Sequence, residues 1–342
     1  MVGVALLGAG IFAKEEHLPA IEACSNMTLK AVYSRSQTSA SALASAHNSA
    51  LDTYFDNPSS NDRTLDALLS RSDISTVVIA LPITAQPPII KKALRAGKHV
   101  LSEKPIAKDV ETAKDLINFY KQLGNQKPIW AVGENLKFVE GLVIGAEKLK
   151  QIGGEVTTFA VEMFTFVDES NKWYNTEWRR TPDYQGGFIL DGGVHFVAGL
   201  RLLLNAVGQD ISSLTAKTDL VVPILAPVDT VHAVLTTPTG RSGTISMSWA
   251  TEFKSGLSLQ VVTTNGSVAV SATDVKIKRK GQEEETIQYK FSMGVKQEME
   301  AFSASLLKGK VNAKQSIEEA LKDLQVLEGM LKSGETGKMF TL

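Results

Sequence analysis

The sequence is poor in several residue types that mark particular classes of protein. Its 342 residues include one cysteine, Cys24, which excludes an internal disulfide and favours a reducing compartment, the cytoplasm. We interpret Cys24 as a small hydrophobic residue on a helix face. The 36 basic residues are balanced by 37 acidic ones and form no basic stripe, so nucleic-acid binding is not expected. The five histidines form no cluster at metal-ligand spacing, so no metal site is predicted.

Long apolar runs are also absent. No stretch approaches the ~20 residues that cross a bilayer, so we expect no membrane partner. The apolar start, MVGVALLGAG, carries neither a charged leader region nor a small-residue cleavage site, and it continues directly into a glycine turn. A buried strand explains this start better than a signal peptide does.

The first third of the chain alternates short apolar runs with helical patterns, which is typical of a doubly wound parallel sheet. The runs lack polar alternation, as expected for strands that are buried on both faces. They cover Val2–Leu7, Leu29–Tyr33, Thr76–Leu81 and His99–Leu101, and the helical patterns cover Ser60–Leu69, Pro88–Ala96 and Val110–Leu123. The segment LGNQKP, at 123–128, breaks this rhythm before one further strand, IWAVGE. We therefore predict a dinucleotide-binding domain at 1–125 and a substrate-binding and oligomerisation domain at 126–342.

Beyond about residue 154 the pattern changes to consecutive strands with few helices between them. The strand-like segments are EVTTFAVEMFTF, TVHAVLTT, SGTISMSWA, LSLQVVTTNGSVAVSA and VKIKRK, and helices are expected at Val194–Leu204, Lys296–Lys308 and Ser316–Lys332. Asn265-Gly266 is a two-residue hairpin signal. The predicted fold class is α/β, with the parallel sheet followed by a domain on a large, mostly antiparallel open sheet. Apolar alternation in SGTISMSWA and LSLQVVTT predicts a partly exposed face that a second copy would cover.

A glycine turn follows the first strand directly. LLGAGIFA places Gly8, Gly10 and Ala13 at the spacing of a dinucleotide-binding turn, with Ile11 and Phe12 between them. The first glycine permits the tight turn, the second lets the backbone approach a pyrophosphate, and the third position must be small. The phosphates of a cofactor would then meet unpaired N–H groups where the helix begins. A plain strand-to-helix turn is the alternative.

The second strand ends without the carboxylate that usually binds a ribose hydroxyl. The chain instead offers Ser34, Arg35, Ser36 and Thr38. A carboxylate would repel a 2′-phosphate, whereas Arg35 could pair with it and the hydroxyls could donate hydrogen bonds. This pattern favours NADP(H) over NAD(H), with a solvated surface arginine as the alternative interpretation.

A lysine lies just past another buried strand, in AGKHVLSEKPIAKDVETA. Ligands of open α/β sheets bind at the carboxyl ends of strands, so Lys104 can face the binding crevice. Pro105 rigidifies the turn and disfavours helix at Lys104. A surface ion pair between Glu103 and Lys104 would explain the same residues.

An aspartate and a histidine occur four residues apart in QGGFILDGGVHF. Asp191 and His195 share a face if both begin one helix, and a carboxylate beside an imidazole fixes its tautomer for acid–base chemistry. The neighbouring pairs of glycines would let the backbone approach a bound group. An N-capping aspartate beside an incidental histidine is the alternative. The remaining histidines lack a comparable setting: His17, His47, His99 and His232.

Together, GAGIFA, AGKHVLSEKPIA, WRRTPDYQGGFILDGGVH and the two-domain plan resemble the Gfo/Idh/MocA family of oxidoreductases over essentially the whole chain. The resemblance implies an N-terminal Rossmann domain, a C-terminal α/β domain and, often, dimers formed through the open sheets. It places Lys104, Asp191 and His195 beside the nicotinamide and the reacting carbon, and Trp178 and Arg179 near the cofactor. The remaining cofactor contacts that it implies are Leu81, Pro82, Gln86, Glu103, Lys104 and Asn135.

Two segments depart from the family pattern. Many members carry Pro-Asn-x-x-His after the fourth strand, whereas this chain reads Pro82-Ile83-Thr84-Ala85-Gln86. ENLKF, at 134–138, has Lys137 where members often carry arginine. Neither departure touches the three residues expected at the reaction centre.

These patterns predict an NADP(H)-dependent oxidoreductase that acts on the CH–OH group of a sugar-like or other small hydroxy or carbonyl compound. Either Lys104 or His195 could be the main acid–base group. The alternatives are a non-catalytic sensor that binds NADP(H), and a glycosidase that uses NAD as a bound redox helper. Four aromatic residues could line a sugar-stacking wall or belong to the core: Trp173, Tyr174, Trp178 and Tyr184.

Overall fold

A computed structural model describes residues 1–47, 50–56, 62–125 and 127–342. The chain forms two compact units. The first comprises Met1–Ala107, Glu111–Glu134 and Val295–Leu321, and the second comprises Lys108–Val110, Asn135–Gly294 and Lys322–Leu342. Strand β6 (Trp130–Gly133) and helix α9 (Val295–Lys308), both beyond residue 125, thus belong to the first unit.

The first unit contains a six-stranded parallel sheet in the order β3-β2-β1-β4-β5-β6. The order in which successive strands are added to the sheet reverses between β1 and β4, which is where dinucleotides bind in Rossmann folds. The strands are β1 (Val2–Leu7), β2 (Met27–Ser34), β3 (Asp52–Phe55), β4 (Thr76–Ile79), β5 (His99–Glu103) and β6 (Trp130–Gly133). Strand β3 was not predicted from the sequence, because DTYF is short and none of its residues is buried.

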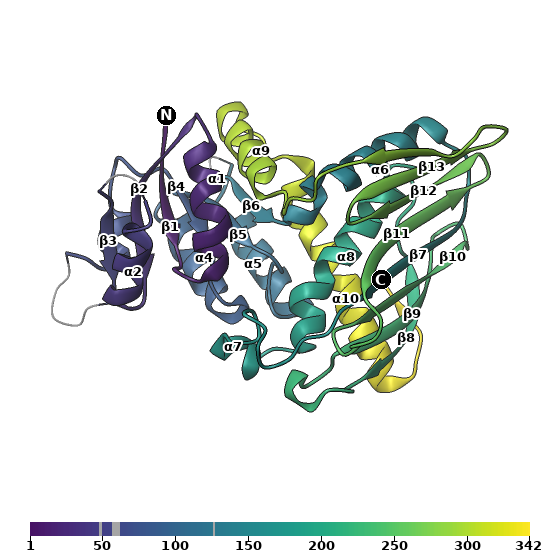
Figure 1. The fold of residues 1–342 in the computed structure, drawn as a ribbon. Helices are drawn as coiled ribbons and strands as arrows, with labels where there is room; N and C mark the ends of the chain where they lie inside the picture. The colour runs from purple at the N-terminus through teal and green to yellow at the C-terminus, as the bar shows by residue number, and fades with distance from the viewer. Residues whose placement is uncertain (48–49, 57–61, 126) are drawn as a thin grey trace. The chain divides into compact units, whose positions relative to one another are not determined.

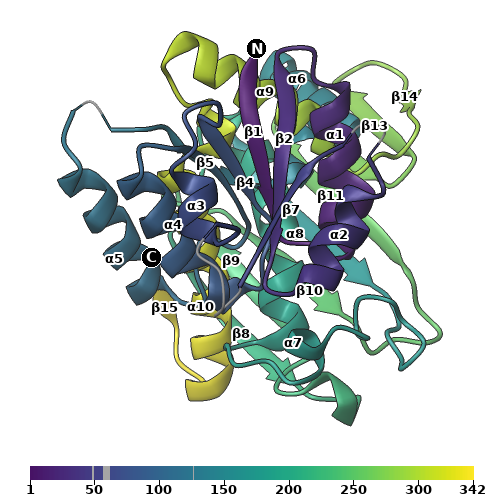
Figure 2. The same cartoon turned by 90° about the vertical axis from the view of Figure 1, so that its left-hand side faces the viewer.

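Helices cover both faces of this sheet, with α1 and α2 on one side and α4 and α5 on the other (Figure 2). The helical segments of this unit are η1 (Ala13–His17), α1 (Leu18–Ala23), α2 (Gln37–Ala44), α3 (Leu65–Leu69), η2 (Ile83–Ala85), α4 (Gln86–Arg95), α5 (Val110–Gln122), α9 (Val295–Lys308) and η5 (Ala313–Gln315). Segment η1 is π-helical and runs into α1, where Pro19 cannot donate a backbone hydrogen bond. The helix predicted at Ser60–Leu69 begins only at Leu65, and residues 60 and 61 lie outside the described part.

The second unit contains a nine-stranded, mostly antiparallel sheet in the order β14-β13-β12-β11-β7-β10-β9-β8-β15. The β7–β10 pair is parallel. The strands are β7 (Val156–Phe164), β8 (Ser213–Asp219), β9 (Thr230–Thr236), β10 (Ser242–Ser248), β11 (Gly256–Thr263), β12 (Gly266–Ser271), β13 (Asp274–Arg279), β14 (Glu285–Gln288) and β15 (Phe340–Thr341). The predicted fold class is confirmed in both sheets.

The hairpin predicted at Asn265-Gly266 joins β11 to β12, but its two turn residues are Thr264 and Asn265. Gly266 is already the first residue of β12. A Cβ atom there would lie 2.1 Å from the Lys278 carbonyl oxygen of β13. The glycine therefore serves the close approach of two strands rather than the turn.

Helices of the second unit lie on one face of its sheet, as Figure 1 shows for α6, α8 and α10. The helical segments are η3 (Asn135–Phe138), α6 (Glu140–Ile152), α7 (Glu177–Arg180), α8 (Gly187–Asn205), η4 (Pro223–Leu225) and α10 (Ile317–Thr336). Among the described helices, only α8 is long and apolar enough to cross a membrane by length and composition. In its 18-residue apolar window, 78% is buried inside the protein, because α8 packs beneath the sheet.

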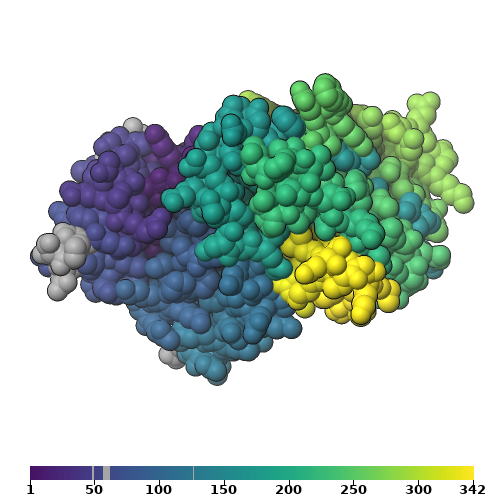
Figure 3. All heavy atoms as spheres, turned by 90° about the horizontal axis from the view of Figure 1, so that it is seen from below, coloured from purple at the N-terminus to yellow at the C-terminus, as the bar shows by residue number. Residues whose placement is uncertain are grey.

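The outward face of this sheet is less apolar than the sequence suggested. Outward residues of β10 are Ser242, Thr244 and Ser246, whose hydroxyls replace the expected apolar surface. Val234 of β9, directly opposite Thr244, is 54% exposed. The alternating apolar residues of β10 and β11 instead lie on the face of the sheet that the helices cover. The last residues of the chain, yellow in Figure 3, lie at the surface, where β15 pairs with β8.

Candidate functional site

The glycine turn after β1 has the geometry of a cradle. Gly8 has a φ of 118°, and a Cβ atom on it would lie 2.1 Å from the Ala80 carbonyl oxygen. A Cβ atom on Gly10 would meet no described atom within 4 Å, so the backbone is open there. Ala13 is 1% exposed, because the helix packs closely on the sheet. The turn thus has the tight backbone and the open space at Gly10 that a dinucleotide-binding turn requires.

The end of β2 presents polar groups to solvent. Ser34 is half-buried, whereas Arg35, Ser36 and Thr38 are exposed. The Ser36 hydroxyl caps α2, because its Oγ accepts a hydrogen bond from the Ser39 backbone N–H at 3.2 Å. Arg35 is therefore the main cation available at this point.

An acidic residue that the sequence analysis did not single out lies beside this loop. Asp56 follows β3, and its backbone N–H donates to the Arg35 carbonyl oxygen. The Tyr33 hydroxyl donates a 2.6 Å hydrogen bond to Asp56 Oδ1. Burial and the Asp56 carboxylate raise the pKa of Tyr33, so this hydroxyl stays protonated as a donor.

The loop after β4 contributes a buried amide. Leu81 and Pro82 are half-buried, and Gln86, the first residue of α4, is 2% exposed. Neither side-chain atom of the Gln86 amide has a hydrogen-bond partner among the described residues. Because buried amides are normally bonded, this side chain is a candidate ligand contact.

The end of β5 holds Glu103 in a pair that the sequence did not reveal. His17 Nε2 lies 2.6 Å from Glu103 Oε1, and the His17 side chain is 1% exposed. The His17 ring also packs edge-on against Phe12, with 5.2 Å between ring centres. The expectation that His17 lacks a setting like that of His195 is therefore wrong. Lys104, the next residue after Glu103, is half-buried.

In the second unit, α8 begins at Gly187, seven residues before the helix predicted at Val194–Leu204, so Asp191 and His195 both lie on it, four residues apart. Arg179 Nε donates to Asp191 Oδ2 at 2.7 Å. The Arg179 guanidinium also stacks on Trp178 at 4.0 Å and Trp173 at 5.3 Å. Arg179 is thus held by a carboxylate and two indole rings, a specific arrangement that sequence spacing did not reveal.

The aromatic residues near this pair contribute a polar atom as well as apolar surface. The Trp178 and Tyr184 ring centres are 5.9 Å apart, and Tyr184 is 7% exposed. Its hydroxyl has no hydrogen-bond partner among the described residues, and burial raises its pKa.

Asn135 of η3 is also buried, and its Nδ2 donates to the Met293 carbonyl oxygen at 2.7 Å.

The glycines around Asp191 lie close to other side chains of the protein and do not border open space for a bound group. A Cβ atom on Gly192 would lie 2.7 Å from the Trp249 ring, and one on Gly186 would lie 2.6 Å from Leu331. The sequence interpretation of these glycines is therefore wrong. They permit close packing of α8 against its neighbours.

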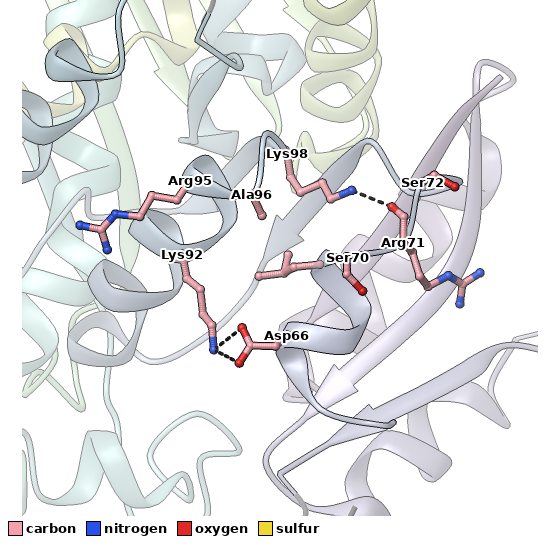
Figure 4. Close-up of a pocket in the computed structure, with 9 residues that line it drawn as sticks. Asp66, Ser70, Arg71, Ser72, Lys92, Arg95, Ala96 and Lys98 are labelled. Carbon is pink, nitrogen blue, oxygen red and sulfur yellow. Dashed lines mark hydrogen bonds and ion pairs between the residues drawn. The ribbon is translucent and has the colours of Figure 1, made fainter. Parts of the chain in front are cut away.

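A pocket of about 450 Å³ opens elsewhere on the first unit (Figure 4). Its residues precede β4 and β5, so it lies at the amino ends of these strands, away from the glycine turn. Figure 4 shows Lys92 directed at Asp66, and Lys98 donating to the Arg71 carbonyl oxygen at 2.7 Å. These lysines serve the protein's own ion pairs and helix ends.

Among the described residues, no group of three or more His, Cys, Asp or Glu side chains could hold a metal ion.

The predicted residues of the first unit gather at the carboxyl ends of β1, β2, β4 and β5. Those of the second unit gather around the start of α8, apart from Asn135. Each unit thus brings its own predicted residues together.

Comparison with known proteins agrees with this arrangement. Residues 2–129 match a family model described as an oxidoreductase family with an NAD-binding Rossmann fold, and residues 149–342 match the C-terminal alpha/beta domain of the same oxidoreductases. The chain is 46% identical to dehydrogenase FPY6 of Fusarium mangiferae, over 97% of this chain and 96% of that protein. It is 33% identical to dTDP-3,4-didehydro-2,6-dideoxy-alpha-D-glucose 3-reductase of Streptomyces violaceoruber, over 60% of this chain and 54% of that protein.

A crystal structure of an oxidoreductase from Thermotoga maritima has the same fold, with a TM-score of 0.87 and 28% identity. The match covers 99% of this chain and 98% of that one. With both family models and a near full-length relative in agreement, the chain belongs to the Gfo/Idh/MocA family of NAD(P)-dependent oxidoreductases.

Proposed function

We propose that the protein is an NADP(H)-dependent oxidoreductase that transfers hydride between the nicotinamide and a CH–OH or carbonyl group of a sugar-like compound. The observation that carries the cofactor choice is the exposed Arg35 at the end of β2, where a ribose-binding carboxylate is usual. The sugar-like substrate is suggested by the family and by the nucleotide-sugar reductase among its relatives.

The residues present fit the cofactor. The open backbone at Gly10 would approach the pyrophosphate, with Ile11 and Phe12 beginning the helix whose N–H groups face it. Arg35 would pair with the 2′-phosphate, and Ser34 and Thr38 would add hydroxyl donors. Asp56, the acidic residue nearby, is already bonded to Tyr33. The buried Gln86 amide would gain a partner.

Lys104, Asp191 and His195 carry the proton chemistry in this proposal. When bound, the nicotinamide accepts or supplies the hydride. His195 takes the hydroxyl proton during oxidation, and Lys104 donates a hydrogen bond that stabilises the developing alkoxide. In the second variant Lys104 exchanges the proton and His195 orients the substrate. The ion pair with Arg179 fixes the Asp191 carboxylate beside the helix turn that bears His195.

Two features of the cellular setting belong to the same proposal. We infer a cytoplasmic location from the single cysteine, Cys24, which is buried and free. We also infer a homodimer that pairs the outward faces of the nine-stranded sheets. The exposed Val234 and the small hydroxyl side chains of β10 would form a flat contact surface there.

Cofactor choice is tested by titration calorimetry. NADP(H) should bind more tightly than NAD(H), and Arg35→Ala should weaken NADP(H) by about 1.5–3 kcal/mol, the value of a lost charge-assisted contact. NAD(H) affinity should stay unchanged in the same variant. Equal affinity of the wild type for both cofactors contradicts the proposal.

Catalysis is tested with purified protein, NADP(H) and a panel of sugars, aldehydes and ketones. Lys104→Met and His195→Asn should each lower kcat by roughly 10²–10⁴-fold, the range of acid–base groups, while cofactor affinity changes little. Near wild-type turnover in either variant removes that residue from the mechanism. Tight NADP(H) binding without turnover of any compound supports the sensor alternative instead.

A further inference from the structure

One carboxyl group of the first unit is fully buried without a hydrogen bond. Glu298 of α9 is 0% exposed, and neither of its carboxyl oxygens has a partner among the described residues. The carboxyl lies against the end of β6. A Cβ atom on Gly133 would be 3.2 Å from Glu298 Oε2 and 3.4 Å from Oε1, so any other residue there would shift the carboxyl by a few tenths of an ångström.

Glu298 belongs to a group that we name the acidic cluster, formed by His17, Glu103, Glu134 and Glu298. The carboxylates of Glu103 and Glu134 both act electrostatically on Glu298. His17 is paired with Glu103, at 2.6 Å. The helix formed by η1 and α1 packs on α9, and its other charged residues are exposed or half-exposed: Lys14, Glu15, Glu16 and Glu22. Lys296 and Glu300 of α9 are also exposed, and Lys314 of η5 is half-exposed. Gln315, the residue after Lys314, donates a hydrogen bond to the Glu298 carbonyl oxygen.

Three carboxyl groups and one imidazole cannot all be charged in a buried site without a large cost. Burial is the main cause that raises the pKa of Glu298 well above its ordinary value of 4.5, and the charges of Glu103 and Glu134 raise it further. A neutral Glu298 carries an O–H donor, and an unsatisfied buried donor is costly. The Glu103 and Glu134 carboxylates, which act electrostatically on Glu298, are its candidate acceptors. Glu103 is the strand partner of Gly133, against which the Glu298 carboxyl lies.

We propose that Glu298 is a neutral carboxylic acid that positions the Glu103–Lys104 turn by sharing its proton with the Glu103 and Glu134 carboxylates. This inference rests on the proposed role of Lys104, the residue that follows Glu103. Glu298 is a positioning residue, since it acts on Lys104 only through the backbone and side chain of Glu103. An ionised Glu298 would repel Glu103 and displace the turn.

The protonation state is tested first, by infrared difference spectroscopy of wild-type protein against Glu298→Gln at neutral pH. We expect the C=O stretching band of a protonated carboxyl group in the wild type and its loss in the variant. Glu300→Gln, an exposed substitution on the same helix, should leave the band unchanged. Identical wild-type and Glu298→Gln spectra in this region overturn the proposal. Neither substrate nor cofactor is needed, so this result is independent of the proposed function.

Positioning is tested by steady-state kinetics on the substrate that the catalytic assay identifies. Glu298→Gln keeps a neutral donor of the same shape, and its kcat should stay within about threefold of wild type at neutral pH. Glu298→Met removes the donor and should lower kcat by roughly tenfold to hundredfold, the cost of a displaced catalytic group, with unchanged NADP(H) affinity. If Glu298 had a purely structural role, the kcat values of Glu298→Gln and Glu298→Met would not differ in this way at unchanged NADP(H) affinity.

The pH profile gives a second readout. The ratio of kcat for Glu298→Gln to kcat for wild type should rise as the pH increases, because only the wild-type side chain ionises. A constant ratio, or a Glu298→Met variant that folds and retains wild-type kcat, overturns the positioning role. In either case a strong effect of Lys104→Met would leave the proposed function intact.

Discussion

Each compact unit buries a group of charged side chains, but only the second unit neutralises its group with its own members. There, Lys137 Nζ lies 2.6 Å from Asp323 Oδ2, and Arg201 bonds the other oxygen of Asp323. Arg201 also forms a bidentate pair with Asp210, with both N–O distances at 2.8 Å. We name Lys137, Arg201, Asp210 and Asp323 the paired cluster. It balances two cations with two carboxylates.

The acidic cluster of the first unit has three carboxyl groups and only one imidazole. Buried charges are normally paired, and departures from that rule concentrate at functional sites. The paired cluster joins η3, α8 and α10, which is a structural task. The acidic cluster adjoins Lys104, the residue that we expect at the reaction centre. We therefore infer that the paired cluster supports the fold, and we propose that the acidic cluster is retained for activity.

The largest expected effect breaks the paired cluster. Arg201→Met leaves Asp210 without its bidentate partner and leaves Asp323 with Lys137 alone. The free energy of unfolding should fall by about 3–5 kcal/mol, the cost of a buried charge that has lost its partner. Urea denaturation measures this change.

A matched control is available in the same unit. Arg241 and Glu155 form an exposed pair at 3.7 Å, and Arg241→Met should change stability by less than about 1 kcal/mol. If Arg201→Met costs no more than Arg241→Met, the paired cluster does not support the fold.

A smaller effect follows from the raised pKa of Glu298. Below about pH 4.5 the folded and unfolded states both hold the proton. As the pH rises further, the unfolded carboxyl ionises while the folded one stays neutral, so stability falls by about 1.4 kcal/mol per pH unit until the folded group ionises. The stability of Glu298→Gln lacks this slope, and its difference from wild type should grow with pH. Parallel curves for the two proteins would show that Glu298 is ionised when folded.

The smallest expected change in stability comes from removing the carboxyl of Glu298, and it contrasts with the loss expected from the same kind of change in the paired cluster. Glu298→Met replaces a buried carboxyl that has no cationic partner among the described residues with an apolar group of similar length, so stability at neutral pH should change by less than about 1 kcal/mol or rise. Asp323→Leu, the corresponding change in the paired cluster, should cost about 3–5 kcal/mol. Similar losses in the two variants would remove the distinction between the clusters.

The fold was largely predictable because buried parallel strands and amphipathic helices leave local patterns. The first strand, Val2–Leu7, matches its predicted bounds, and the helices predicted from residue 296 and residue 316 are confirmed within a few residues. Short strands such as β14 and β15 left no such pattern. Their positions are set by pairing with distant strands.

The site was predictable only where its residues occur in one local motif. The glycine turn and the Asp191–His195 spacing are of this kind. The His17–Glu103 pair joins residues 86 positions apart, and Arg179 reaches Asp191 across a loop. Lys137 was noticed only as a departure from the family, whereas the structure shows it bonded to Asp323, 186 positions away. Single-sequence patterns cannot reveal such long-range pairs.

The return of α9 to the first unit has a consequence for synthesis on the ribosome. The residues of the glycine turn, the Glu103–Lys104 turn and β6 emerge early, but Val295–Leu321 follows only after residues 135–294. At about 5–20 residues per second, that interval lasts roughly 8–32 seconds. During it, the nascent nucleotide-binding unit lacks the helix that bears Glu298, and the site that α9 will cover is open to chaperones.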